Sequence, residues 1–150
     1  TNTHGVYWAN QQGCDVIIDV ATLTGAAPVA VGKTFAALYC NTEELENCAV
    51  QAGRYIGELC HPLPYTPELY VHEFYSLIAD MKNSVKNRAN AQSACAGQFI
   101  GNHLPSDQTW LHIDIAGPAW GTNKRGTGFG VGLLLQIGKS WGDKVDKNDP

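Results

Sequence analysis

Positive charge is scarce in this sequence of 150 residues. Lys and Arg together number 10 against 14 Asp and Glu, and the formal net charge is −4. No cluster of Lys and Arg occurs that would match the phosphates of a nucleic acid or an anionic membrane surface. The composition therefore predicts neither a nucleic acid nor a membrane as a partner.

Long hydrophobic runs are also missing. The longest, VIIDVA from Val16 and VGLLLQI from Val131, fall far short of the roughly 20 apolar residues that cross a bilayer. No basic segment precedes an apolar one in the manner of a secretory signal. At 44% hydrophobic residues the chain has enough apolar material for the core of one domain.

Paired cysteines are absent as well. The five cysteines are widely spaced and form no CxxC pair, so a zinc-cysteine site is not expected. An odd number of scattered cysteines is typical of reduced, buried thiols. We therefore expect a cytoplasmic protein.

Several familiar catalytic motifs are incomplete. HEFYS, from His72, lacks the second histidine of a zinc-protease HExxH, and GTGFGVG at 126–132 lacks the GxGxxG spacing of a dinucleotide loop. Ser93 lies in a helical context and not in a GxSxG elbow. Cys95 and His112 are one conceivable thiol–imidazole pair, but a buried thiol on a helix of small residues is favoured.

The order of elements predicts an α/β fold, with a mostly parallel mixed sheet and helices on both faces. Apolar runs without alternation are typical of strands covered on both sides. We expect such strands at 15–21, 35–40 and 110–115, and a further short strand at 78–84. Expected helices are the end of one at 5–13, one beginning near Pro28, 42–57, 91–104, and a fully buried one at 129–137. We expect a domain over 1–138 and a polar tail over 139–150.

Two aspartates interrupt the apolar strands. Asp19 and Asp114 both have apolar neighbours, and a buried carboxylate is costly unless it is hydrogen-bonded or neutralised. The favoured interpretation is structural: each carboxylate accepts hydrogen bonds that fix a loop, which for Asp114 is the AGP turn that follows it. A metal-ligand role is the alternative, but two aspartates on separate strands do not by themselves make a two-metal site.

Three segments carry a resemblance to a known family. DVIIDVATLTGAA (15–27), ADMKNSVKNRANAQSACAG (79–97), and WLHIDIAGPAW (110–120) followed by GTGFGVGLLLQI (126–137) resemble the leucyl aminopeptidases, cytosolic exopeptidases with two metal ions. The match runs in order from about Gly5 to Ile137. MKNSV and TGFGV are most similar to the probable-aminopeptidase branch of the family.

The resemblance implies a parent enzyme that removes leucine-like N-terminal residues from peptides with two divalent ions, zinc or manganese, and that forms hexamers. The family's metal ligands include an NTDAEGR motif just before the helix that reads GVYWANQQG here. This chain begins TNTHGVYW: Asn2 and Thr3 are either the first letters of that motif or part of a divergent lead-in. In both cases we expect no catalytic residue and no metal on this chain alone.

The resemblance also places the substrate. Positions matching Thr22, Gly25, Ala116 and Ala119 line the pocket for the N-terminal side chain, and the backbone of Leu23 and Gly25 holds the peptide. The Thr22–Gly25 turn follows a parallel strand, where open α/β sheets bind ligands, and free N–H groups of the next helix suit a carbonyl. Pro118 and Ala119 stand where many relatives have a larger apolar residue. The alternatives are a non-catalytic aminopeptidase-like protein that binds peptides or assembles, and a less favoured nucleotide-binding domain.

Overall fold

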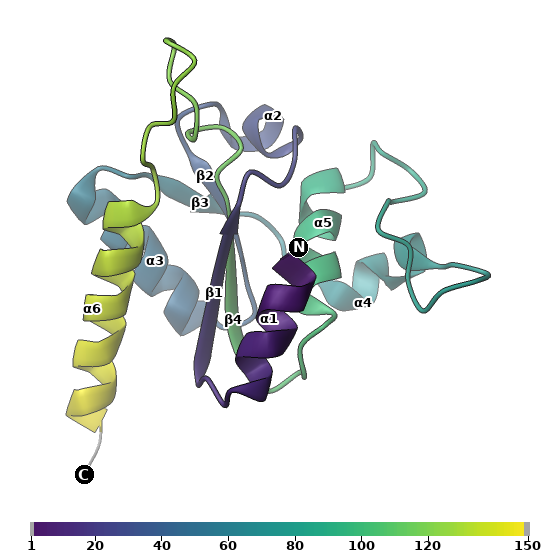
Figure 1. Ribbon diagram of the computed structural model, residues 1–150, viewed down its shortest axis with the longest axis horizontal. Helices are drawn as coiled ribbons and strands as arrows, with labels where there is room; N and C mark the ends of the chain where they lie inside the picture. The colour runs from purple at the N-terminus through teal and green to yellow at the C-terminus, as the bar shows by residue number, and fades with distance from the viewer. Residues whose placement is uncertain (1, 149–150) are drawn as a thin grey trace.

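The computed structural model of the protein describes the backbone of residues 2–148 and the side chains of residues 2–144. Its centre is a four-stranded sheet in the order β1-β4-β2-β3 (Figure 1). β1 pairs in parallel with β4, β2 pairs in parallel with β3, and β2 and β4 are antiparallel. The prediction of a mixed, mostly parallel sheet is confirmed. The strands are β1 (Val16–Ala21), β2 (Ala36–Cys40), β3 (Cys60–Pro62) and β4 (Thr109–Asp114).

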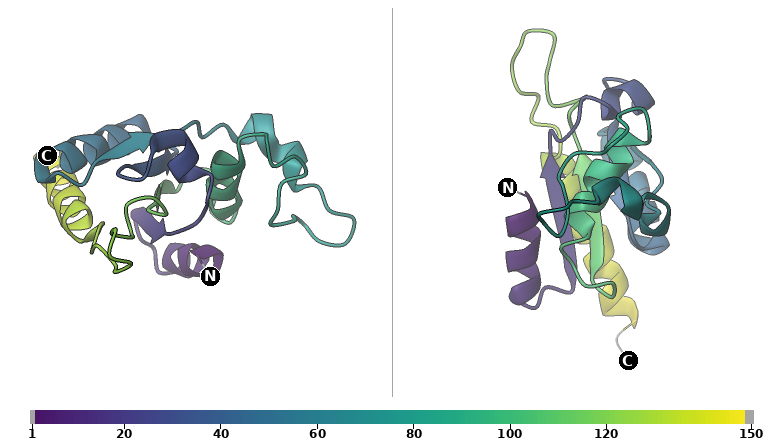
Figure 2. Two further views of the ribbon diagram at one scale, coloured as in Figure 1. Left: turned by 90° about the horizontal axis from the view of Figure 1, so that it is seen from above. Right: turned by 90° about the vertical axis from the view of Figure 1, so that its right-hand side faces the viewer.

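Helices cover both faces of the sheet, as predicted (Figures 1 and 2). On one side lie α3 and α6, and on the other lie α1 and α5. The helices are α1 (Asn2–Gln11), α2 (Ala27–Val31), α3 (Glu43–Ile56), α4 (Pro67–Tyr70), the 3-10 helix η1 (Val71–Phe74), α5 (Gln92–Gly101) and α6 (Val131–Asn148). None of these helices is long and apolar enough to cross a membrane, over the part of the chain that the structure describes.

The two faces of β4 differ in chemistry. Leu111 and Ile113 point into a purely apolar layer with α3 and α6, and each fully buried aliphatic side chain there contributes about 1.5–3 kcal/mol. The alternate residues Trp110, His112 and Asp114 are also fully buried, but they face the side of α1 and α5. One face is therefore an ordinary core, and the other holds the buried polar groups.

Local signals explain where α3 and α6 begin and end. Thr42 is extended before α3, three glutamates lie in the helix's first turn, and Gly57 ends it in the left-handed conformation (φ 82°). At the start of α6, the N–H groups of Gly130 and Leu133 donate to one carboxylate oxygen of Glu58, at 3.1 and 2.7 Å. Glu58 thus satisfies helix-end donors that have no partner within the helix.

The structure differs from the expected elements at several points. Residues 78–84 form bends and irregular structure and not a strand: Ile78 is 97% exposed and no described strand pairs with the segment. The short β3 was not predicted, and neither was α4, which begins at Pro67 inside an expected connection. The helix expected to be wholly buried exposes Val131 and Leu135, because α6 packs on α3 by one face only. α6 runs on to residue 148, so part of the expected polar tail is helical. The division at 138/139 stays a prediction, and residues 149 and 150 lie outside the described part.

A long segment between η1 and α5 projects from the body of the molecule (Figure 2, left). It is fixed at its base by Glu73, whose buried carboxylate accepts the N–H groups of Lys86 at 2.9 Å and Asn87 at 3.2 Å, and the side-chain amide of Asn90 at 2.8 Å. The loop that leads into α5 is therefore ordered by one acidic side chain.

Candidate active-site wall

Two turns meet at the carboxyl end of the sheet. β1 and β4 are parallel neighbours with Ala21 opposite Asp114, and the N–H of Ile115 donates to the carbonyl of Ala21 at 2.8 Å. The turn after β1 (22–25) and the turn after β4 (115–119) must therefore leave the sheet side by side. Chemistry that needs groups from both turns is possible at this edge.

Asp114 joins the two turns. Its carboxylate accepts the N–H groups of Leu23, Thr24 and Ala116, each at 3.0 Å, and the Thr24 hydroxyl at 2.8 Å. The side chain is fully buried, so these four donors replace the water that a carboxylate would otherwise need. The expected structural role of Asp114 is confirmed, and it extends to the turn after β1 as well as to the AGP turn.

Thr24 is itself the end of a chain of buried hydroxyls. Its Oγ1 lies 2.9 Å from Ser93 Oγ of α5, and Ser93 Oγ accepts a hydrogen bond from the phenol of Tyr39 in β2 at 2.5 Å. The N–H of Ala27, at the start of α2, also donates to Thr24 Oγ1. No sequence signal predicts this cluster, because the residues in each of its hydrogen-bonded pairs, Asp114 included, are 54 to 90 positions apart along the chain.

Asp19 is the second buried acceptor on this face. Its carboxylate receives hydrogen bonds from Asn2 of α1 at 2.9 Å and from the Trp110 indole at 2.8 Å, and lies 2.7 Å from His112 Nδ1. The His112 ring stacks between Trp110 and Tyr39. Asp19 is therefore a hydrogen-bonded acceptor, as we expected, but its partners are side chains and it attaches α1 to the sheet instead of fixing a loop.

The predicted substrate residues occupy different parts of this edge. Thr22 and Leu23 line a cavity of about 610 Å³ together with Phe99 and Ile100 of α5. Gly25 lines a neighbouring cavity of about 540 Å³. Ala116 and Ala119 lie in the adjacent turn, and neither borders any of the cavities described.

Only some backbone donors and acceptors around Leu23 are free to bind a peptide. The N–H of Leu23 is held by Asp114, so this group is not available to a peptide. Within the described part of the chain, the Leu23 carbonyl and the Gly25 N–H have no hydrogen-bond partner. α2 has only five residues and the N–H of Ala27, its first residue, is held by Thr24. The expected set of free helix-end donors therefore reduces to the N–H groups of Gly25 and Ala26.

The turn after β4 is packed too closely to admit a side chain at Gly117. A Cβ there would lie 2.9 Å from the carbonyl oxygen of Gly32 and 3.3 Å from Lys33 Cα. Ala119 follows with both backbone groups engaged, to Ile115 and Thr127. The wall formed by this turn is therefore rigid and built from small residues.

The residues described here do not fit a dinuclear metal site. Among residues 2–144, no group of three His, Cys, Asp or Glu side chains converges as metal ligands would. The carboxylates of Asp19 and Asp114 are already occupied by protein donors.

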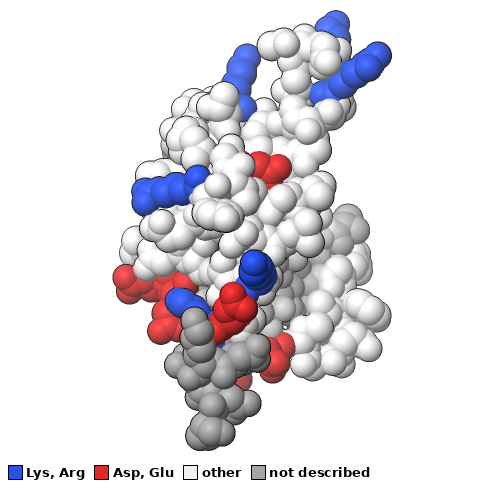
Figure 3. All heavy atoms as spheres, turned by 90° about the vertical axis from the view of Figure 1, so that its left-hand side faces the viewer, with Lys and Arg blue, Asp and Glu red and all other residues white. Residues whose placement is uncertain are grey.

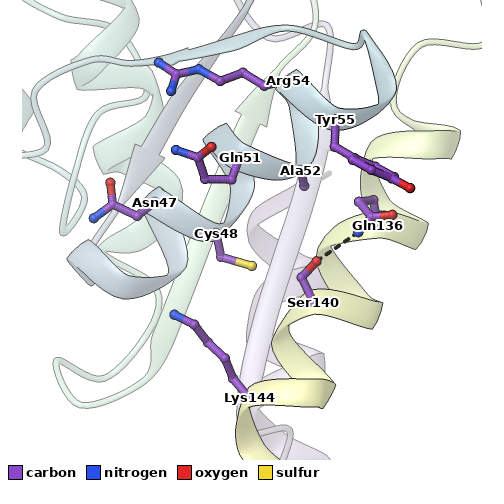
Figure 4. Close-up of a pocket in the computed structure, with 9 residues that line it drawn as sticks. All are labelled: Asn47, Cys48, Gln51, Ala52, Arg54, Tyr55, Gln136, Ser140 and Lys144. Atoms are coloured by element: carbon purple, nitrogen blue, oxygen red, sulfur yellow. Dashed lines mark hydrogen bonds between the residues drawn. The ribbon is translucent and has the colours of Figure 1, made fainter.

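A separate groove of about 620 Å³ lies between α3 and α6, and Figure 4 shows that Cys48, Gln136 and Lys144 line it from the two helices. Acidic and basic side chains mix at the lower end of this face, and basic side chains project from its upper end (Figure 3). The groove lies in the layer of α3 and α6, across the sheet from the buried hydroxyls.

The cysteines show no sign of a nucleophile. Burial raises the pKa of the Cys40, Cys48 and Cys95 thiols, and that of Cys60 to about 12. These four are buried as predicted, but Cys14 is exposed. Cys95 contacts the carbonyl of Asn90 and His112 is bonded to Asp19, so the conceivable thiol–imidazole pair does not form.

Comparison with known proteins decides the family. The model of the cytosol aminopeptidase family, catalytic domain, matches residues 4–135. The chain belongs to this family. It is 50% identical over 133 residues to the probable aminopeptidase NPEPL1 of Mus musculus, which covers 87% of this chain and 25% of the relative.

Solved structures of cytosol aminopeptidases agree. The leucyl aminopeptidase of Trypanosoma cruzi is similar with a TM-score of 0.85 and 45% identity, over 91% of this chain and 27% of that one. The Trypanosoma brucei enzyme in complex with bestatin gives 0.87 and 42%, over 93% and 28%. The chain thus spans about a quarter of the length of the relatives it matches. Enzymes of this family use two metal ions.

Proposed function

We propose that the protein containing this chain is a leucyl aminopeptidase-type metalloenzyme, and that this chain supplies the wall which holds the substrate. The observation that carries the proposal is the pair of unpartnered backbone groups, the Leu23 carbonyl and the Gly25 N–H, beside the cavity lined by Thr22 and Leu23. One acceptor and one donor, two residues apart, match the N–H and carbonyl of an extended peptide. Asp114 holds the turn so that both groups stay in place.

The substrate is an N-terminal residue with a leucine-like side chain. By family resemblance we propose that the Thr22 side chain, Gly25, Ala116 and Ala119 line one pocket for that side chain in the whole enzyme. In this chain Thr22 and Gly25 border two neighbouring cavities and the two alanines border neither. Three of these four residues are small. Small residues leave room for a bulky apolar group. Ala119, where many relatives have a larger residue, favours a wider pocket.

The two divalent ions, zinc or manganese, are proposed to bind residues of the parent protein outside this chain, which contributes no catalytic residue. By family resemblance we propose a cytoplasmic homo-hexamer as its assembly. The ions supply the activated water of the reaction. The role left to this chain is to bind and orient the peptide.

The test uses the full-length protein, expressed from the complete coding sequence and loaded with zinc or manganese. We expect it to release leucine from leucyl-amidomethylcoumarin and from leucyl peptides, and to be inhibited by bestatin, which the Trypanosoma brucei relative binds. Chelation should abolish turnover. A folded, metal-loaded protein that releases no N-terminal residue would overturn the proposal.

A non-catalytic, peptide-binding role is the second candidate. It is favoured by the absence of a ligand cluster among residues 2–144. The intact mass of the native protein separates the two candidates: a chain of roughly this length points to the non-catalytic role, and one about four times longer to the enzyme. Binding of leucyl peptides without hydrolysis would support the non-catalytic role.

A further inference from the structure

We propose that Ser93 and Tyr39 are positioning residues that fix the peptide-binding turn 22–25 through the hydroxyl of Thr24. The inference rests on the proposed function, because it concerns the same turn. Thr24 stands between the two backbone groups proposed to hold the peptide, those of Leu23 and Gly25. Whatever orients Thr24 therefore orients both.

The direction of the hydrogen bonds is determined at one end. The Thr24 hydroxyl donates to Asp114, whose carboxylate also receives three backbone N–H groups. The single proton of Thr24 is thus used, so Ser93 must donate to Thr24. Ser93 in turn accepts from the phenol of Tyr39. The result is a one-way chain from β2 through α5 to the turn and on to β4.

Tyr39, the first donor in this series of hydrogen bonds, is held rigidly in place. Tyr39 is fully buried, its ring stacks on His112 at 5.9 Å, and α5 approaches it so closely at Gly97 that a Cβ would lie 2.8 Å from Tyr39 Cγ. Burial raises the pKa of the Tyr39 phenol well above its usual value, so it remains a proton donor in alkaline solution. A rigid donor of fixed polarity is what positioning requires.

Loss of the Tyr39–Ser93–Thr24 hydrogen bonds should weaken substrate binding more than it slows the chemical step. The turn contacts parts of the peptide that change little in the reaction, so its interactions are similar in the ground state and the transition state. Without Ser93, Thr24 loses one of the partners that hold its rotamer, and the Leu23 carbonyl and Gly25 N–H lose their fixed spacing. KM should therefore rise while kcat stays nearly constant.

The experiment measures kcat and KM for leucyl peptides with the full-length, metal-loaded enzyme and its Ser93→Ala and Tyr39→Phe variants, well below their melting temperatures. We expect Ser93→Ala to raise KM about three- to tenfold and Tyr39→Phe about two- to threefold, with kcat changed by less than about twofold. KM of the double variant should be no higher than that of Ser93→Ala, because both substitutions act through the same series of hydrogen bonds.

Matched controls are Ser140→Ala and Tyr55→Phe, which lie in the groove between α3 and α6; they should leave KM unchanged. If Ser93→Ala does not fold, Tyr39→Phe decides alone, since it retains the buried ring. Wild-type KM in both folded variants, or additive effects in the double variant, overturns the positioning role. A wild-type enzyme without activity instead overturns the proposed function, and the two failures are thus distinct.

Discussion

The carboxylate of Asp114, at the end of β4, binds the backbone N–H of Leu23 at 3.0 Å, although the two residues are 91 positions apart. The same side chain binds Thr24 and Ala116. A single buried acid therefore sets the relative position of two turns whose sequences are both rich in small residues. Close packing at Gly117 holds the turn after β4 in place, and the hydrogen bonds to the Asp114 carboxylate join that turn to the turn after β1.

Replacing Asp114 should lower stability and leave metal binding intact. In the full-length enzyme, Asp114→Ala leaves three buried N–H groups without an acceptor, and we expect a loss of about 3 kcal/mol or more in the free energy of unfolding. Metal content, measured on the folded variant, should equal that of the wild type. Asp107→Ala, in an exposed loop, is the control and should change little. Loss of one metal equivalent at an unchanged melting temperature would show that Asp114 is a ligand.

Gly25→Val should impair turnover and spare the fold. Gly25 does not have a positive φ, and a Cβ built on it meets nothing within 4 Å, so backbone strain is no reason for glycine here. The open space is instead the proposed path of the peptide, which the two added methyl groups would enter. We expect KM to rise at least tenfold, with stability unchanged within about 0.5 kcal/mol. Kinetics like those of the wild type would remove Gly25 from the site.

The sequence predicts the main strands of this fold because its continuous apolar runs are clear. The runs around Ile17, Leu38 and Leu111 have no alternation, and the structure covers these strands on both faces. The bounds of α3 agree equally well with the predicted range of 42–57, because Thr42 precedes a first turn rich in glutamate and Gly57 ends the helix. Such signals are local, so they survive without knowledge of the tertiary structure.

What the sequence could not predict depends on distant partners. Ile78 begins the segment 78–84, which was expected to be a short strand, but no neighbouring strand pairs with it. Ser93 looked like one small helical residue among several, and only the approach of β2 and the turn after β1 gives its hydroxyl a function. Asp114 was predicted as an acceptor for its own turn, but its bonds to Leu23 and Thr24 required the parallel pairing of β1 with β4.

Two helical glycines provide a matched pair for packing. In α5, a Cβ at Gly97 would lie 2.8 Å from the Tyr39 ring, so Gly97→Ala in the full-length protein should destabilise by about 1–3 kcal/mol. In α6, Gly138 is exposed with nothing within 4 Å, so Gly138→Ala should stabilise by about 0.5–1 kcal/mol through helix propensity. Denaturant unfolding measures both. Equal effects of the two substitutions would contradict the close approach of α5 to β2.

The loop before α5 should open in acid, and only below the usual range of a glutamate. Hydrogen bonds from the Asn90 side chain, and from the N–H groups of Asn87 and Lys86, lower the pKa of Glu73. A carboxyl whose pKa is lower in the folded state contributes stability that is complete above its unfolded pKa and disappears as the pH falls through the folded one. Hydrogen exchange at residues 86 and 87, corrected for the intrinsic rate at each pH, should therefore stay slow in mild acid and accelerate only in stronger acid.

The Glu73→Gln variant removes the titrating group, so its loop should exchange quickly in neutral solution and lose this pH dependence. Glu68→Gln, an exposed position in α4, should behave like the wild type. Because the loop leads directly into α5, which holds Ser93, Glu73→Gln should also raise KM for leucyl peptides in neutral solution, where the metal ions stay bound. Exchange that accelerates well above the ordinary glutamate range, or that is identical in wild type and Glu73→Gln, would show that other groups hold the loop.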